Sequence, residues 1–217
     1  MVATMSYGFL DIAMTPSVKA AQEANGSGGV YADFRGHREF DRFTAAEQEF
    51  ISARDSFYMA TVSETGWPYV QHRGGPPGFV RVLDDRTLAC ADFRGNRQYI
   101  SVGNLAANDR ACLFLMDYPH RQRLKIYARV ETSALKDRPE LAEKLATPGY
   151  KAKIERALIF HLEAFDWNCP QHITPRFTES ELAEVVDPVR TQIATLEREN
   201  QALKERLLQK SEAEKRD

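Results

Sequence analysis

The chain has 217 residues, enough for one sizeable domain with an appendage, and its 43% hydrophobic and 28% charged residues are typical of a soluble globular protein. Its 29 basic and 31 acidic residues nearly balance, which leaves no electrostatic footprint for nucleic acid. The apolar runs are too short to span a bilayer and the N-terminus lacks the pattern of a secretion signal, so we expect neither nucleic acid nor a membrane as its partner.

The cysteines bear on where the protein works. Cys90, Cys112 and Cys169 are widely and irregularly spaced, which fits neither a disulfide framework nor a metal site. Cys90 and Cys112 lie in apolar runs and are expected in the core. We therefore expect a reducing, cytoplasmic location and no metal.

The first 43 residues are predicted to form an arm with a short helix. Thr15 is the expected N-cap, followed by Pro16 at the first helical position, and Asn25-Gly26 ends the helix. Residues 26–29 are expected to be a loop; it is not a phosphate loop, because no Lys-Ser/Thr pair follows. A second helix is predicted from Thr44, where residues 44–47 have capping-box spacing.

From residue 56 the pattern changes to short strands rich in aromatic and β-branched residues. After them a short helix is expected, with Asp137 as its N-cap and Pro139 near its start. Strands at this close, even spacing favour a closed antiparallel barrel. The seven predicted strands are 56–63, 68–73, 79–83, 87–91, 111–118, 123–133 and 155–167.

The C-terminal segment has a heptad pattern typical of a coiled coil. β-Branched residues at a with Leu at d favour two strands, and a single Asn at a fixes the register. The alternative is a lone amphipathic helix folded back on its own domain. Pro188 is expected early in the helix rather than in its middle, so the regular coil is expected to start near it. The a positions are Val186, Ile193, Asn200 and Leu207, and the d positions are Leu182, Val189, Leu196 and Leu203.

Residues 91–100 form the segment most indicative of chemistry. The chain leaves a predicted strand, turns at Gly95 and enters a helix for which Asn96 is the expected N-cap. A helix start presents unpaired backbone N–H groups that favour an anion, and Arg97 and Gln98 add side-chain donors there. This pattern indicates a phosphate site; the alternative is an ordinary strand-to-helix junction with a surface arginine.

Residues 57–176 resemble the flavin-binding split barrels of the pyridoxamine 5'-phosphate oxidase family. In that family a strand ends in a basic residue and a later turn carries a phosphate clamp. Gln98 stands where the clamp more often has Lys, so phosphate binding here depends more on Arg97. The Gln of an Arg-Gln pair reaches the flavin from a neighbouring strand, and a Trp and an Arg lie near the end of the barrel. The matching residues are Phe79-Val80-Arg81 for the strand, Asn96-Arg97-Gln98 for the clamp, Arg121-Gln122 for the pair, and Trp167 with Arg176.

The resemblance implies a mainly β fold, a six- to seven-stranded antiparallel split β-barrel of the FMN-binding type, here with a C-terminal coiled-coil helix. It also implies a homodimer with flavin mononucleotide (FMN) at the subunit interface. Asp92 and Phe93, at the end of the strand before the clamp, are added to the expected cofactor contacts. The expected domains are an N-terminal arm (1–43), the FMN-binding barrel (44–177) and the coiled-coil helix (178–217).

The expected function is an FMN-dependent oxidoreductase acting on a small organic substrate. Vitamin B6 phosphates are not the expected substrate, because authentic oxidases carry Arg-x-His where this chain has His172-Ile173-Thr174. His72, Arg73 and His172 are candidate substrate contacts; the alternative for the first two is a solvent-facing strand edge. The alternative function is a non-catalytic flavin sensor or carrier that signals through its coiled coil to a partner. A split barrel holding a deazaflavin or haem is a further alternative.

Overall fold

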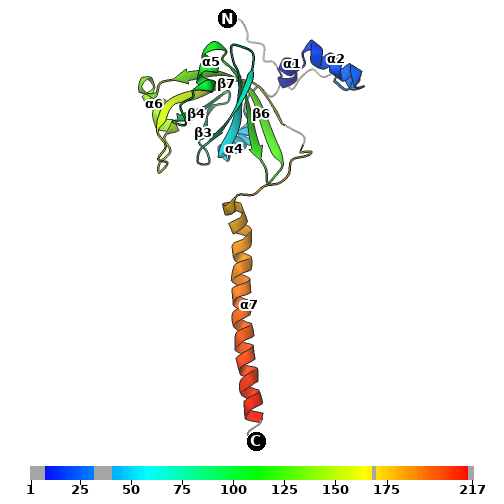
Figure 1. Ribbon diagram of the computed structural model, residues 1–217, viewed down its shortest axis with the longest axis vertical. Coiled ribbons are helices and arrows are strands. Elements are labelled where there is room, and N and C mark those ends of the chain that lie inside the picture. Colours follow the sequence, from blue (N-terminus) through cyan, green and yellow to red (C-terminus); the bar gives the residue numbers. More distant parts are fainter. Residues whose placement is uncertain (1–7, 32–40, 168–169, 215–217) are drawn as a thin grey trace. The chain divides into compact units, whose positions relative to one another are not determined.

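The computed structural model describes residues 8–31, 41–167 and 170–214 (Figure 1). The chain divides into two compact units, Met1–Ile173 and Thr174–Asp217. Cys169 lies outside the described residues. None of the described helices is long and apolar enough to cross a membrane.

The first unit is built on one seven-stranded antiparallel sheet, which confirms all seven predicted strands (Figure 1). The strand order is β2-β1-β5-β6-β7-β4-β3, so β2 and β3 are the two edges and are not paired with each other. The sheet is therefore an open, split barrel rather than the closed barrel that the strand spacing favours. The strands are β1 (Ser56–Val62), β2 (Pro68–Gly74), β3 (Val80–Asp84), β4 (Thr87–Phe93), β5 (Arg110–Asp117), β6 (Gln122–Ser133) and β7 (Ile154–Trp167).

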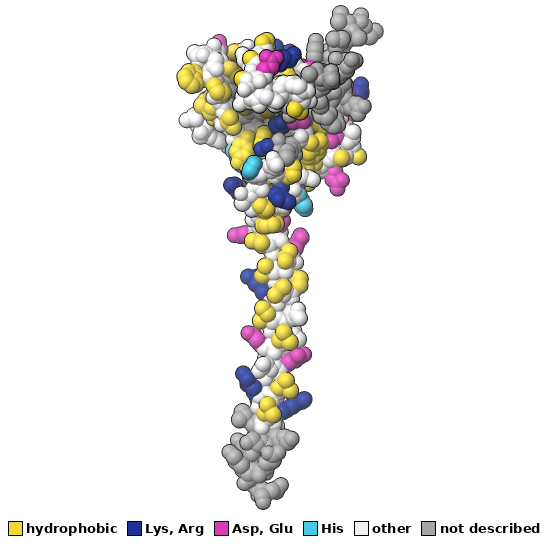
Figure 2. Space-filling view, turned by 90° about the vertical axis from the view of Figure 1, so that its right-hand side faces the viewer, with side chains coloured by type: hydrophobic (Ala, Val, Ile, Leu, Met, Phe, Trp, Pro, Cys, Tyr) yellow, Lys and Arg dark blue, Asp and Glu magenta, His cyan; other side chains and the backbone are white. Residues whose placement is uncertain are grey.

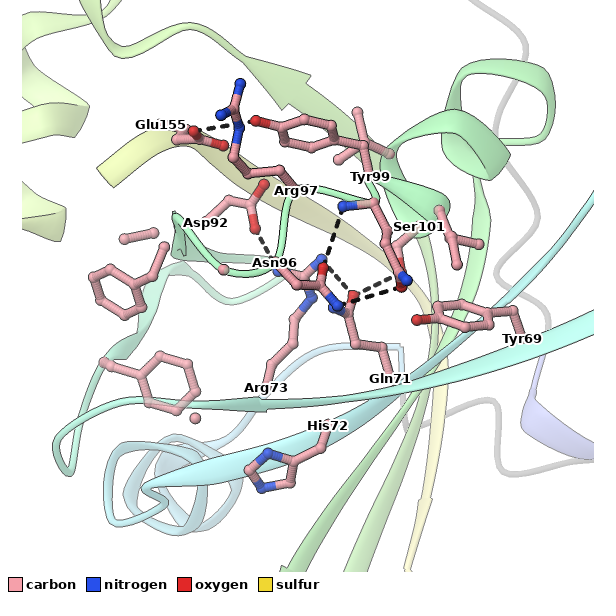
Figure 3. A pocket seen from close by; sticks show the side chains of 18 residues that line it. Tyr69, Gln71, His72, Arg73, Asp92, Asn96, Arg97, Tyr99, Ser101 and Glu155 are labelled. Carbon is pink, nitrogen blue, oxygen red and sulfur yellow. Dashed lines mark hydrogen bonds and ion pairs between the residues drawn. The ribbon is translucent and has the colours of Figure 1, made fainter. Parts of the chain in front are cut away.

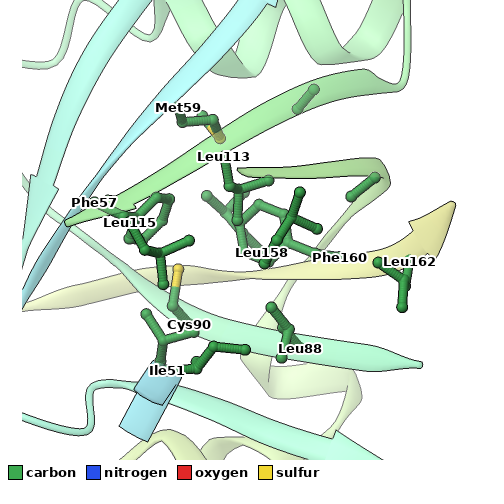
Figure 4. Close-up of a cluster of buried hydrophobic side chains, with 14 of the residues drawn as sticks. Ile51, Phe57, Met59, Leu88, Cys90, Leu113, Leu115, Leu158, Phe160 and Leu162 are labelled. Carbon is green, nitrogen blue, oxygen red and sulfur yellow. The ribbon is translucent and has the colours of Figure 1, made fainter. Parts of the chain in front are cut away.

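Side-chain alternation along the strands makes the core. In β5, residues 111, 113, 115 and 117 are buried and those between them are half-buried, as period-two alternation requires. Phe57, Met59, Leu113, Leu158 and Phe160 meet inside the barrel (Figure 4). On the other face of β4 and β7, a smaller apolar cluster forms under α6 (Pro139–Leu145). The central strands β4 and β7 are thus buried on both faces.

The helix α4 (Ala45–Ser52) covers one part of the barrel interior. It begins with the predicted capping box, in which Thr44 and Glu47 bind each other's backbone N–H groups. The other carboxylate oxygen of Glu47 accepts a 2.8 Å hydrogen bond from the indole of Trp167. Phe50 packs edge-on against the same indole, with ring centroids 4.8 Å apart. These contacts tie the helix to the end of β7.

Two expectations about the helices need correction. Residues 28–31 form a short helix, α3 (Gly28–Tyr31), within what was expected to be a loop. Asp137 does not cap α6: it ends a 3₁₀ turn, η1 (Leu135–Asp137), and Arg138 takes the N-cap position without a side-chain bond. The fixed φ of Pro139 is sufficient to start the helix there. The predicted ends of α2 (Pro16–Ala24) are confirmed: Thr15 accepts from Val18 N–H, and Gly26 is left-handed. The remaining helix of the arm is α1 (Phe9–Ala13).

The second unit contains one long helix, α7 (Glu179–Glu214), which confirms the predicted C-terminal helix. It begins nine residues before Pro188, so the proline lies in the first third of the helix, early in it as expected. A capping box at Thr178 and Glu181 fixes the start of the helix, because it supplies partners for the free N–H groups there. Apolar side chains follow one side of the helix (Figure 2). Pairing into a coiled coil stays a prediction.

Candidate functional site

A pocket of about 310 Å³ lies between β2, the end of β4 and the start of α5 (Ile100–Ala107) (Figure 3). Residues 69 and 71–74 of β2 and its end line one wall, and residues 91–93 of β4 line another. The turn 95–99 and the first turn of α5 complete the rim, together with Phe79 and Glu155. The pocket thus lies where edge strand β2 approaches the opposite half of the sheet.

A buried carboxylate joins these two walls. Asp92 Oδ1 on β4 lies 2.6 Å from Arg73 Nη1 on β2, and Asp92 Oδ2 lies 3.2 Å from Arg156 Nε on β7. The side chains of Arg73 and Asp92 are only 11% and 10% exposed, so this pair is shielded from water. Asp92 was expected to contact the cofactor; the structure shows that both of its oxygens are held by arginines.

A glutamine fixes the inner wall of the pocket. Gln71 Oε1 accepts from Arg73 Nη2 at 3.0 Å and from Ser101 Oγ at 2.8 Å. Since the carbonyl oxygen of the amide is occupied twice, the amide nitrogen is the group left to face a ligand. Gln71 thereby links β2 to α5 in the wall of the pocket (Figure 3).

The turn before α5 has an unusual backbone. Arg97 and Tyr99 both have positive φ, 64° and 53°, which is uncommon for residues other than glycine and often marks a functional site. Asn96 does not cap a helix as expected: its Oδ1 accepts from Gln98 N–H at 3.2 Å, and the helix begins only at Ile100. Asn side chains often bond the backbone two residues on, and this turn competes with helix formation.

Charges around this turn are unevenly neutralised. Glu155 accepts from the Tyr99 hydroxyl at 3.2 Å and lies 3.5 Å from Arg94 Nε. Arg156 stacks over the Tyr99 ring, 5.0 Å from its centroid. Arg97 is exposed at the rim and makes no ion pair with any residue that the structure describes. The rim therefore carries one uncompensated guanidinium.

Eight of the predicted site residues line this pocket: His72, Arg73, Phe79, Asp92, Phe93, Asn96, Arg97 and Gln98. Among them, His72 lies on the opposite face of β2 from Arg73, because side chains alternate along a strand (Figure 3). Its ring meets Tyr58 edge-on at 5.4 Å.

The other predicted residues do not line it. Val80 is buried in the core and Arg81 is half-buried on β3. Gln122 is exposed at the start of β6, and Trp167 packs against α4. His172 is exposed, with a positive φ of 62°. The remaining residue, Arg176, belongs to the second unit.

Sequence reasoning missed ten lining residues, of which five have polar side chains: Tyr69, Gln71, Tyr99, Ser101 and Glu155. Residues 69, 71 and 73 are two apart, so period-two alternation places them on one face of β2. That spacing was the available signal for Tyr69 and Gln71. Ser101 and Glu155 reach the site through tertiary packing, for which the local pattern holds no signal.

Neither Cys90 nor a cluster of metal-ligating side chains belongs to the lining of this pocket in the described residues. Burial raises the pKa of the Cys90 thiol to about 12, against the opposing influence of Arg73, so the thiol stays protonated at neutral pH. Within the described part of the chain, no group of three His, Cys, Asp or Glu residues is arranged to hold a metal ion.

Comparisons with known proteins identify a family through one family model. A family model described as pyridoxamine 5'-phosphate oxidase matches residues 43–164. No curated protein matches the chain. Similar solved structures include HupZ from Group A Streptococcus, at 15% identity and a TM-score of 0.45 over 62% of this chain and 99% of that one. A general stress protein 26-related protein of the pyridoxinephosphate oxidase family from Clostridium acetobutylicum has 18% identity and a TM-score of 0.43, over 63% and 94%. A FAD-binding protein from Mesorhizobium loti has 14% identity and a TM-score of 0.42, over 58% and 94%.

Proposed function

Because this chain belongs to the pyridoxamine 5'-phosphate oxidase family, we propose that it binds FMN in the pocket between β2, β4 and α5. We further propose that it acts as an FMN-dependent oxidoreductase on a small organic substrate. Bound FMN supplies the redox chemistry, and the residues of the chain bind the cofactor, orient it and limit access to it.

The uncompensated guanidinium of Arg97 is the observation that carries this proposal. Arg97 lies on the pocket rim, and it can grip a phosphate through two parallel hydrogen bonds. Residues 100–102 of α5 also line the pocket, and no side chain caps this helix. Its first N–H groups are therefore available to an anion. This donor set fits the terminal phosphate of FMN.

The inner wall fits the other end of the cofactor. The amide nitrogen of Gln71 is left to donate to a ligand, because its oxygen already accepts from Arg73 and Ser101. A flavin ring presents carbonyl oxygens and ring nitrogens, which accept hydrogen bonds from such a donor. Arg73 is held by Asp92 and Gln71, so we assign it a positioning role in this wall rather than a substrate contact. His72 and His172 stay as proposed substrate contacts.

We also propose that the site is shared between two copies of the chain. Gln122 and Trp167 resemble flavin contacts of the family, but neither lines the pocket of its own chain. The resemblance implies flavin at a dimer interface, so Gln122, Trp167 and Arg176 would serve the pocket of the second copy. Trp167 would offer only its ring there, because its N–H is donated to Glu47.

A titration of FMN into full-length variants tests both proposals. Arg97→Ala removes a charge-assisted contact and should weaken FMN binding by about 1.5–3 kcal/mol. Gln122→Ala should weaken binding as well, although the residue lies outside its own pocket. Arg138→Ala removes the same charge from an exposed pair with Glu131 and should leave the dissociation constant unchanged. Unchanged binding in Arg97→Ala would contradict the phosphate placement, and unchanged binding in Gln122→Ala would contradict the shared site.

The thiols fit the proposed cytoplasmic location. Cys90 and Cys112 are free, and burial raises the pKa of both thiols. Protonated, shielded thiols of this kind need no oxidising compartment.

A further inference from the structure

No other described part of the second unit covers the apolar side of α7. Six of its a and d side chains are between 49% and 67% exposed, although all are large and aliphatic. A long helix with such a narrow stripe and a polar exterior is typical of a coiled-coil strand. The six are Leu182, Val189, Ile193, Leu196, Leu203 and Leu207.

A shallow depression lies along part of this apolar side. A shallow groove along α7 is lined by Ile193, Leu196, Glu197 and Asn200, with Gln201 and Lys204 at its end. In a coiled coil, each apolar knob inserts into a hole formed by four residues of the facing helix. The first four residues occupy successive a, d, e and a positions, which form the hole for a d residue of a parallel partner.

Asn200 selects the partner and the direction. In a parallel, in-register pair, an a residue meets the same a residue of the other helix, so Asn200 meets Asn200 of a second copy. There the two amides can bond each other, since each has both donors and acceptors. In an antiparallel pair, a residues face d residues, all of which are Leu or Val in this helix. An unpartnered amide in an apolar layer is costly, so that arrangement is disfavoured.

Charge complementarity points to the same pairing. Glu199 is at g and Lys204 is at e of the next heptad, and g faces the following e of a parallel partner. Symmetry gives this attractive contact twice. Within one helix the two residues are five apart, so they are not neighbours on its surface.

We infer that α7 pairs with α7 of a second copy as a parallel, in-register, two-stranded coiled coil with Asn200 facing its symmetry mate. The two chains then enter the coil from the same end. This pairing is independent of flavin binding and of the shared site.

Cysteine cross-linking of the full-length protein tests the direction and the register. Asn200→Cys puts two thiols opposite each other, within the short Cβ separation that a disulfide requires, and should give a covalent dimer on mild oxidation. Ala202→Cys, two residues away at the outward c position, should give no covalent dimer. The parent chain, with its native cysteines, should give none either. If Asn200→Cys stays monomeric on denaturing gels, the helix pairs in another direction or register, or with a partner other than a second copy. Equal cross-linking of the two variants shows proximity without the inferred packing. Either result overturns the inference.

A charge exchange tests the contact itself. Glu199→Lys and Lys204→Glu each place like charges across the seam and should lower hydrogen-exchange protection of α7 by about tenfold. The double variant Glu199→Lys with Lys204→Glu restores opposite charges and should recover the parent protection. A double variant as poorly protected as the single ones would overturn the inference.

Discussion

Arg73 Nη1 lies 2.6 Å from Asp92 Oδ1, and this ion pair joins two strands that are not neighbours in the sheet. One partner is on edge strand β2, and the other is on β4, next to the opposite edge. The contact links the two sides of the open barrel at a place where no backbone hydrogen bonds join the strands. The proposed cofactor pocket lies beside it.

Removing the carboxylate should therefore destabilise the fold. Asp92→Asn leaves Arg73 and Arg156 without their buried counter-charge, and breaking a buried pair in this way costs about 3–5 kcal/mol. Asp109→Asn is the matched control: its pair with Arg129 has both side chains 47% exposed, and its loss should cost less than about 1 kcal/mol. Urea unfolding measures both. Equal losses in the two variants would show that the ion pair does not hold the barrel together.

Glu47 should make stability depend on pH. Burial raises the pKa of this carboxyl, but hydrogen bonds from Thr44 and Trp167 together outweigh burial and lower it from 4.5. A pKa lowered by folding gives stability that is present above the unfolded pKa and is lost as the pH falls through the folded one. The free energy of unfolding should thus decrease as the pH is lowered below about 4.5.

Glu47→Gln keeps an acceptor for Trp167 but loses the charge. At neutral pH it should cost about 1.5–3 kcal/mol, and its stability should vary less with pH than that of the parent. Glu49→Gln, exposed on the same helix, should change stability by less than about 0.5 kcal/mol. Urea unfolding from pH 7 to pH 3 compares the three proteins. Parallel pH profiles for Glu47→Gln and the parent would contradict the role of Glu47.

The protein should be a poor oxidase of vitamin B6 phosphates. The resemblance implies an Arg-x-His pair for that substrate, and His172 and Thr174 cannot reproduce a permanent guanidinium together with an imidazole. Arg73 does not replace the missing charge, because Asp92 and Gln71 hold it. The test is to incubate FMN-loaded protein with pyridoxamine and pyridoxine phosphates and to measure the formation of pyridoxal phosphate and peroxide. Turnover of about one per second or faster, within the ordinary enzyme range, would make it a working oxidase.

The strands were predictable because runs rich in aromatic and β-branched residues between turn residues are a local signal. The turn at Asn96 was not, because an Asn before a helix can cap it or bond the backbone two residues on, and both give the same local pattern. Pairing of Arg73 with Asp92 depends on how the sheet curls, which no local signal encodes. Gln71 was detectable as a neighbour of Arg73 on one strand face. Its role became visible only with Ser101, which α5 brings to the pocket.

Flavin binding is tested most directly by the absorbance spectrum of the purified full-length protein, with the released chromophore identified by mass. We predict a yellow protein that releases FMN on denaturation, or a colourless one that takes up added FMN and becomes yellow. A protein that releases haem or a deazaflavin, or that remains colourless after incubation with FMN, would contradict the proposed function.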